Sequence, residues 1–363
     1  MIINLIEILI FGALFLLSFI LISNPLNVNV RANRWFGFFL LLWASYWVDE
    51  LIFIMSGVNV QINTYLPIAL MQFLTPLAFF VVVSYFTNPT SKFNGRSYSH
   101  LALPTLYLIV LLINAKSGGK YYPVQLSLIL INALFYTLYS LFKIRKHQKN
   151  IQQFASSTQE INLNWLEYII YAIIVLVIVI SVFNLVFFEL PLNVFMNSVV
   201  LVIILFIAYY ALKQNEIFPI DAKERDEVVV LSETEQSDEP KRRLVSDEKV
   251  EELKVELNEL MNNNELYLES DLNLIKLAKR LGVTTHQLSY VINKGYGENF
   301  FQFVNRFRVE KAKQMLLDAK HDNLSILGVA FESGFSSKTS FNTTFKKMTD
   351  LTPTEYKKVS SSL

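Results

Sequence analysis

The chain has 363 residues, enough for two or three domains, and 53% of them are hydrophobic, a high share for a soluble protein. Its net charge of +1 averages two unlike parts, because residues 1–213 hold 11 Lys or Arg and 6 Asp or Glu, whereas residues 214–363 hold 21 and 25. The sequence has no cysteine, which excludes disulfides, thiolate metal sites and cysteine nucleophiles. We expect no metal and no cofactor.

The first 213 residues are dominated by apolar runs, most of which reach the roughly 18 to 20 residues needed to span a hydrocarbon core. We therefore predict a seven-helix transmembrane domain over residues 1–213. The fourth run is the shortest, and its roughly 14 apolar residues are also typical of a re-entrant or buried segment. The runs lie near residues 2–22, 35–55, 66–87, 101–114, 123–142, 165–188 and 192–212.

Loop charge predicts the orientation of these helices, because Lys and Arg concentrate in short cytoplasmic loops. With the N-terminus outside, eight basic residues fall in the inner loops and two, Lys116 and Lys120, in the outer loops. Seven crossings then place the C-terminus in the cytoplasm. The eight inner residues are Arg31, Arg34, Lys92, Arg96, Lys143, Arg145, Lys146 and Lys149.

Two neighbouring carboxylates, Asp49 and Glu50, lie in the second apolar run close to Trp43 and Trp47. A charged residue costs about 2.5 to 3.5 kcal/mol at mid-bilayer on insertion scales, so the pair invites a functional explanation. One hypothesis is an outward-facing pocket, formed by these four residues, for a small-molecule or lipid signal. The alternative, which we prefer, is a buried hydrogen-bonded pair or a helix end at the interface.

Residues 214–245 turn polar and acidic, and within them residues 233–243 contain no side chain suited to a hydrophobic core. We predict a flexible cytoplasmic linker. A flexible chain of this length spans about 30 Å root-mean-square.

Residues 246–363 contain two predicted helix-turn-helix units. Such a unit needs a small residue where its helices touch, a glycine in a left-handed turn, and apolar residues that fix the second helix. A long helix containing Phe303, Phe307 and Ala312 joins the two units, and a capping box at Thr352 and Glu355 starts the last helix. The required residues are Ala278, Gly282, Val283, Leu288 and Val291 in the first unit, and Val329, Ala330, Gly334, Phe335, Phe341 and Phe345 in the second.

The second helix of each unit is expected to begin at a hydroxyl cap, Thr284 or Thr285 in the first and Ser336 or Ser337 in the second. The side chains expected on the outward faces are His286, Gln287, Ser289, Tyr290 and Asn293, and then Lys338, Thr339, Ser340, Asn342 and Thr343. The predicted fold is therefore all-α: a seven-helix transmembrane bundle followed by an all-helical domain with two helix-turn-helix units.

Four motifs occur in order: LIKLAKRLGVTTHQLSYVIN, GENFFQFVNRFRVEKAKQML, ILGVAFESGFSSKTSFNTTFKK and LTPTEYKK. Together they resemble the AraC-type DNA-binding domain over about 95 residues, and their order and spacing make the resemblance specific. The seven-helix half is similar, in layout alone, to membrane-tethered members of that family known in bacteria. The resemblance implies double-stranded DNA as partner, with two recognition helices in successive major grooves about 34 Å apart.

Carried over by position, the resemblance assigns base contacts to one set of outward residues in each unit. Family members often carry arginine at the positions of Tyr290 and Thr343, which leaves strong guanine contacts in question. The assigned residues are His286, Ser289, Tyr290, Lys338, Thr339, Asn342 and Thr343.

Lys294, Lys346 and Lys347 are the candidates for phosphate contact, since residues 272–363 hold 14 Lys or Arg against 7 Asp or Glu. The alternative is that these are ordinary solubilising lysines.

The preferred hypothesis is a one-component transcription regulator of the bacterial cytoplasmic membrane, which couples a small-molecule or lipid signal at the bilayer to DNA binding. A homodimer is compatible with it. The alternative is a membrane transporter or passive anchor fused to a DNA-binding domain. An enzyme is not predicted, because an intramembrane aspartyl protease needs acids on neighbouring helices, and Asp49 and Glu50 share one.

Overall fold

The structure is a computed structural model, and it describes residues 2–60, 65–91, 95–159, 161–186, 193–217, 245–321 and 323–360. Throughout this part the chain forms helices and no strands, which confirms the predicted all-α class. It divides into two units, residues 1–147 with 163–217, and residues 148–162 with 218–363. The sequence pattern did not indicate that residues 148–162 group with the C-terminal unit.

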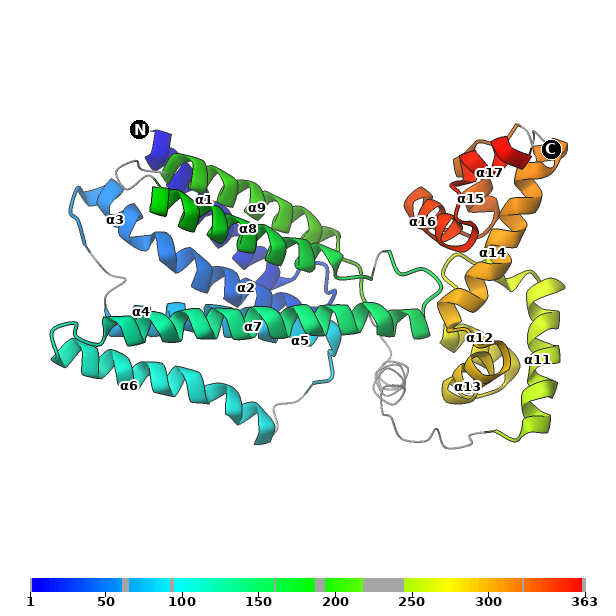
Figure 1. Cartoon of the computed structure of the whole chain (residues 1–363), viewed down its shortest axis with the longest axis horizontal. Coiled ribbons are helices and arrows are strands. Elements are labelled where there is room, and N and C mark those ends of the chain that lie inside the picture. The colour runs from blue at the N-terminus through cyan, green and yellow to red at the C-terminus, as the bar shows by residue number, and fades with distance from the viewer. Residues whose placement is uncertain are drawn as a thin grey trace. The chain divides into compact units, whose positions relative to one another are not determined.

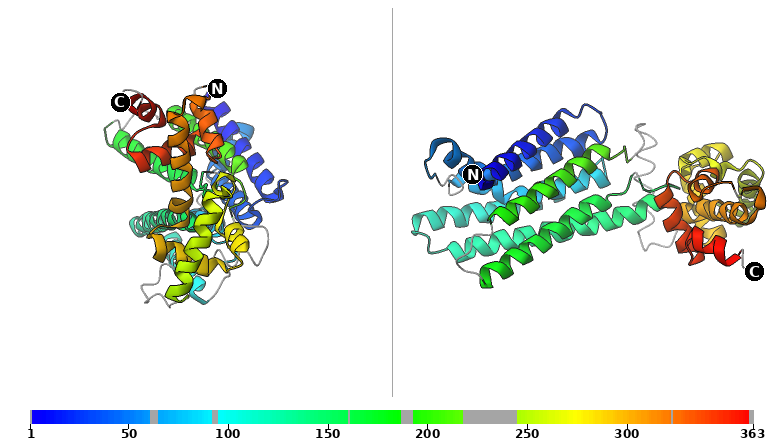
Figure 2. Two further views of the ribbon diagram at one scale, coloured as in Figure 1. Left: turned by 90° about the vertical axis from the view of Figure 1, so that its right-hand side faces the viewer. Right: turned by 90° about the horizontal axis from the view of Figure 1, so that it is seen from above.

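In the described residues of the first unit, helices cover most of each predicted apolar run, and the long helices lie side by side (Figures 1 and 2). Six helices in the described residues are long and apolar enough to cross a membrane, including Tyr98–Lys116, the predicted weak fourth run. The sixth run contributes a shorter apolar stretch at Asn164–Val179. The helices are α1 (Ile2–Ser23), α2 (Val30–Ala44), η1 (Ser45–Trp47), α3 (Val48–Ser56), α4 (Leu66–Phe73), α5 (Thr75–Thr87), η3 (Gly95–Leu101), α6 (Ala102–Lys116), α7 (Tyr122–Asn150), α8 (Asn164–Val186) and α9 (Asn193–Lys213).

Large apolar side chains cover the outside of this unit. Phe19 is 64% exposed, Phe142 63% and Val202 65%, and each lies in a different helix. Soluble monomers seldom expose contiguous apolar surface on this scale, so these helices need a lipid or protein environment.

In the second unit, α14 lies between the α12–α13 pair and the α15–α16 pair (Figure 1). Ser246 caps α11 through its side chain, and the inward stripe of that helix ends on fully buried Met261, whereas Leu260 is only partly buried. The elements are η4 (Ile151–Gln153), α11 (Asp247–Asn262), η5 (Leu266–Leu268), α12 (Leu274–Leu281), α13 (Thr285–Tyr296), α14 (Phe300–Leu317), η6 (Ala319–His321), α15 (Ile326–Glu332), α16 (Lys338–Thr349) and α17 (Pro353–Ser360).

Two apolar clusters hold this unit together. One joins the second half of α14 to α15 and α16, and it is where the predicted inward residues of the second helix-turn-helix unit meet. The other joins α11 to α13. Their members are Val309, Ala312, Met315, Leu316, Val329, Ala330, Phe335, Phe341 and Phe345 in the first cluster, and Val245, Val250, Leu253 and Val291 in the second.

Most of the predicted linker, residues 218–244, lies outside the described residues. At its start, Gln214 accepts a 2.7 Å hydrogen bond from the Trp165 indole, and the Glu216 carboxylate accepts one from the Asn29 backbone. At its end, Val245 is buried beside α11. The described ends are thus fixed to the folded units.

Candidate nucleic-acid interface

The first helix-turn-helix unit is α12, a tight turn and α13. Gly282 ends α12 with φ +63°, in the left-handed region that favours glycine. Thr284 then caps α13 in a capping box with Gln287, whose side-chain oxygen accepts from the Thr284 backbone at 3.0 Å. Of the two cap candidates, Thr284 therefore fills the role, and Thr285 is buried.

The outward face of α13 is narrower than expected. Ser289 is only 5% exposed, because Thr285, Ser289 and Ile292 share a buried face of the helix. We therefore correct its assignment to the exposed side. His286, Gln287, Tyr290 and Asn293 are partly exposed, and Tyr290 also packs against the cluster of α11 and α13.

The second unit is α15, its turn and α16. Gly334 has φ +84°, and a Cβ built there would lie 2.5 Å from the Tyr267 carbonyl oxygen, so only glycine fits. Ser337 caps α16, which settles the choice between Ser336 and Ser337. Phe341 and Phe345 are buried as predicted.

The predicted contact residues of α16 lie on its accessible side. Lys338, Thr339 and Thr343 are exposed, and Ser340 and Asn342 are partly exposed. A helix with this polar face and a capped N-terminus is suited to the major groove of DNA.

The three candidate phosphate-binding lysines differ in their surroundings. Lys294 donates a hydrogen bond to Asp247, which raises the pKa of its ammonium group, and lies 5.6 Å from the centre of the Tyr290 ring. Lys346 and Lys347 are exposed in the last turn of α16. A phosphate must therefore compete with Asp247 for Lys294.

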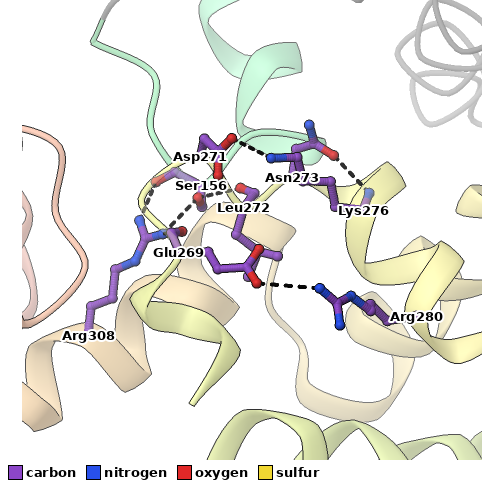
Figure 3. A network of polar contacts seen from close by, with 8 residues as sticks. All are labelled: Ser156, Glu269, Asp271, Leu272, Asn273, Lys276, Arg280 and Arg308. Carbon is purple, nitrogen blue, oxygen red and sulfur yellow. Dashed lines mark hydrogen bonds and ion pairs between the residues drawn. The ribbon is translucent and has the colours of Figure 1, made fainter. Parts of the chain in front are cut away.

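A residue that the sequence pattern did not single out, Arg308, lies at the centre of the unit with 0% exposure. Its guanidinium donates to the Tyr267 carbonyl at 2.7 Å and to the Glu269 carbonyl at 2.8 Å. It also donates to the Ser156 hydroxyl at 3.1 Å, from the segment between α7 and α8 (Figure 3). Burial lowers the pKa of Arg308 to about 10, against the attraction of Asp271, and leaves it charged at neutral pH. Arg308 lies four residues before inward-facing Ala312, so both fall on the same face of the helix. That position in the sequence could have indicated that Arg308 is buried.

The proposed signal-pocket residues lie around a break in the second apolar run. There the helix tightens into η1, so Asp49 and Glu50 fall in the first turn of α3, where acidic side chains suit the helix dipole. The rings of Trp43 and Trp47 lie 6.4 Å apart, and one carboxylate oxygen of Glu50 is buried without a hydrogen-bond partner.

Elsewhere among the apolar helices, polar side chains join neighbouring helices. Glu7 of α1 accepts a 3.2 Å hydrogen bond from Asn197 of α9, and Asn132 of α7 donates to the Phe73 carbonyl at 2.8 Å. Polar contacts of this kind are common between membrane helices.

Comparison with known proteins agrees with this geometry. A family model described as a helix-turn-helix domain matches residues 277–358. An uncharacterized HTH-type transcriptional regulator of Pseudoalteromonas carrageenovora is 30% identical over 118 residues, which are 31% of this chain and 68% of that protein. No solved structure matches this chain.

Longer proteins are also similar to part of this chain. Uncharacterized HTH-type transcriptional regulators of Staphylococcus aureus strains COL and MSSA476 are each 35% identical over 101 residues, 28% of this chain. This chain spans only 13% of the length of these relatives. The similarity to these relatives therefore covers less than a third of this chain.

Proposed function

This chain belongs to the AraC-type family of helix-turn-helix transcriptional regulators, and on that premise we propose that it reads a specific DNA sequence from the membrane in response to a signal. In this proposal α13 and α16 enter successive major grooves. His286, Tyr290, Lys338 and Asn342 contact base edges, and Lys346 and Lys347 contact phosphates.

The observation that carries the DNA-reading part is the pair of capped helices on one central helix. Both α13 and α16 begin at a hydroxyl cap, turn apolar residues inward, and leave polar side chains accessible. Because α14 packs against both pairs, it fixes their separation. Two recognition helices at a fixed separation are what reading two major grooves from one face requires.

The membrane part of the proposal rests on composition and exposure. Among the described residues, six helices have the length and hydropathy of membrane spans, and Asn164–Val179 is a shorter apolar helix that we count as a seventh crossing. The outer surfaces of these helices carry large apolar side chains. The predicted inner loops hold eight basic residues and the outer loops hold two. This difference favours an outside N-terminus and a cytoplasmic DNA-binding domain. We propose a multi-pass protein of the bacterial cytoplasmic membrane.

The test of DNA reading is genome-wide mapping of the DNA bound by the full-length protein in its host. We expect discrete binding sites that share a sequence motif, and loss of those sites in the double variant H286A/N342A expressed at the same level. Unchanged occupancy in the variant would remove the recognition-helix assignment.

Signal sensing needs a separate test, because a passive anchor would also hold the domain at the membrane. A reporter gene placed under a mapped site is measured across growth conditions, with the full chain and with residues 1–147 and 163–217 deleted, so that residues 148–162 stay with the DNA-binding unit. We expect condition-dependent expression only with the full chain. Equal responses from both would favour the anchor.

A further inference from the structure

Residues 154–159 follow α7 in the chain but are built into the DNA-binding unit. The Phe154 carbonyl accepts a 2.9 Å hydrogen bond from the Leu274 backbone, the first N–H of α12. Ala155 forms an antiparallel bridge with Asn273, and the Ser156 hydroxyl donates to the Leu272 carbonyl at 2.5 Å. This short segment therefore covers the start of the first helix-turn-helix unit.

The first three residues of this segment are deeply buried. Phe154, Ala155 and Ser156 are 6%, 7% and 1% exposed. The Ser156 carbonyl accepts from the Asn305 side chain at 2.9 Å, and its hydroxyl accepts from Arg308 (Figure 3). Ser156 thus accepts hydrogen bonds from both a buried guanidinium and a buried side-chain amide.

The same segment reaches the second unit. The Ser157 and Ser336 hydroxyls share a 2.8 Å hydrogen bond, and the Ser337 hydroxyl donates to the Gln159 side chain. Ser337 is the cap of α16. One stretch of six residues therefore touches the first residue of α12 and the cap of a recognition helix.

Helix N-termini and the turns before recognition helices are where helix-turn-helix proteins meet DNA phosphates, because free N–H groups and the helix dipole favour an anion there. Here the Leu274 N–H is already taken by the Phe154 carbonyl, and the Ser337 hydroxyl by Gln159. A phosphate approaching either position meets the segment first.

We propose that residues 154–159 are an intrachain competitor of DNA, which occupies the phosphate-contacting edges of both helix-turn-helix units until it is displaced. The segment is continuous with α7 on one side and α8 on the other. A change in those helices can therefore pull it away or hold it in place, which links the membrane part to DNA affinity. This inference rests on the proposed DNA-reading function.

The test is a reversible lock of the segment in the full-length protein, purified in lipid nanodiscs. The chain has no native cysteine, so S157C/S336C introduces a single pair. The probe is the set of DNA duplexes that the wild-type protein enriches from a random pool. We expect the pair to form a disulfide without DNA, the oxidised form to bind at least tenfold more weakly than the reduced form, and reduction to restore binding. The single-cysteine variants, treated with the same oxidant, control for oxidation itself.

The other outcomes of this experiment contradict either the competitor role or the DNA-reading function. Equal or tighter DNA binding by the oxidised form contradicts the competitor role. Failure of the disulfide to form contradicts the contact between residues 154–159 and the second helix-turn-helix unit. If neither the wild-type protein nor S157A/Q159A enriches a duplex, the proposed DNA reading fails instead. As an independent check, S157A/Q159A removes two side-chain contacts of the segment while leaving α13 and α16 intact. We expect three- to tenfold tighter DNA binding, and unchanged or weaker binding also overturns the inference.

Discussion

At the scale of single residues, Asn342 is the sharpest test of base reading. It is partly exposed on α16 and flanked by buried Phe341, so its truncation leaves the core intact. A bidentate amide contact to a base discriminates by about 1 to 3 kcal/mol. We expect N342A to lower affinity for the preferred sequence roughly 5- to 150-fold while non-specific affinity stays the same, measured by fluorescence anisotropy.

The matched control is N262A, which truncates an exposed asparagine at the end of α11, outside both helix-turn-helix units. It is expected to bind like the wild type. A parallel loss in both variants would point to a general effect on folding and would contradict base reading by Asn342.

The three candidate phosphate-binding lysines should contribute differently to the salt dependence of DNA binding. Each phosphate contact adds about 0.9 to the slope of log affinity against log salt. Lys346 and Lys347 are exposed, so K346A and K347A should each lower that slope by about 1. Lys294 is already paired with Asp247, so K294A should change the slope less than K346A or K347A does. Binding isotherms between about 50 and 200 mM salt measure the slopes, and a larger effect at Lys294 would reverse this ranking.

At the scale of secondary structure, the two turn glycines make a paired prediction. Both have positive φ, but a Cβ at Gly282 meets nothing within 4 Å, whereas at Gly334 it meets the Tyr267 carbonyl oxygen at 2.5 Å. The left-handed conformation alone costs about 1 to 2 kcal/mol for alanine. G334A adds overpacking of about 1 to 3 kcal/mol, so it should destabilise the C-terminal unit more than G282A.

Hydrogen exchange of α15 and α16 is the measurement for both variants. All four tryptophans, Trp35, Trp43, Trp47 and Trp165, lie in the first unit, so their fluorescence serves as an internal control that should not change. Equal protection of α15 and α16 in the two variants would mean that Tyr267 and α15 shift apart freely.

The same elements show how far sequence patterns reach. The capping box at Thr352, the glycine turns and the inward residues were predictable because each depends on neighbours within a few positions. The seating of Ser156 was not, because its partners Leu272 and Arg308 lie 116 and 152 positions away. Ser289 was misplaced because hydroxyl side chains fit both a buried and an exposed helix face.

At the scale of the whole molecule, the two units differ in charge and in surface. The first carries few charged groups and many exposed apolar side chains, whereas the second is rich in both charges and buries its apolar residues in compact clusters. The surface of the first unit suits an apolar environment, and the surface of the second suits water. The orientation of the first unit therefore decides whether the second can reach DNA.

That orientation can be read directly, because a chain without cysteine accepts single cysteines as unique labels. Ser117 is exposed after α6, in a predicted outer loop, and Asn263 is exposed after α11 in the DNA-binding unit. In intact cells, S117C should react with a membrane-impermeant maleimide, whereas N263C should react only after permeabilisation. The cysteine-free wild type controls for background labelling. Labelling of N263C in intact cells would invert the topology and leave the DNA-binding unit on the wrong side of the membrane for transcription.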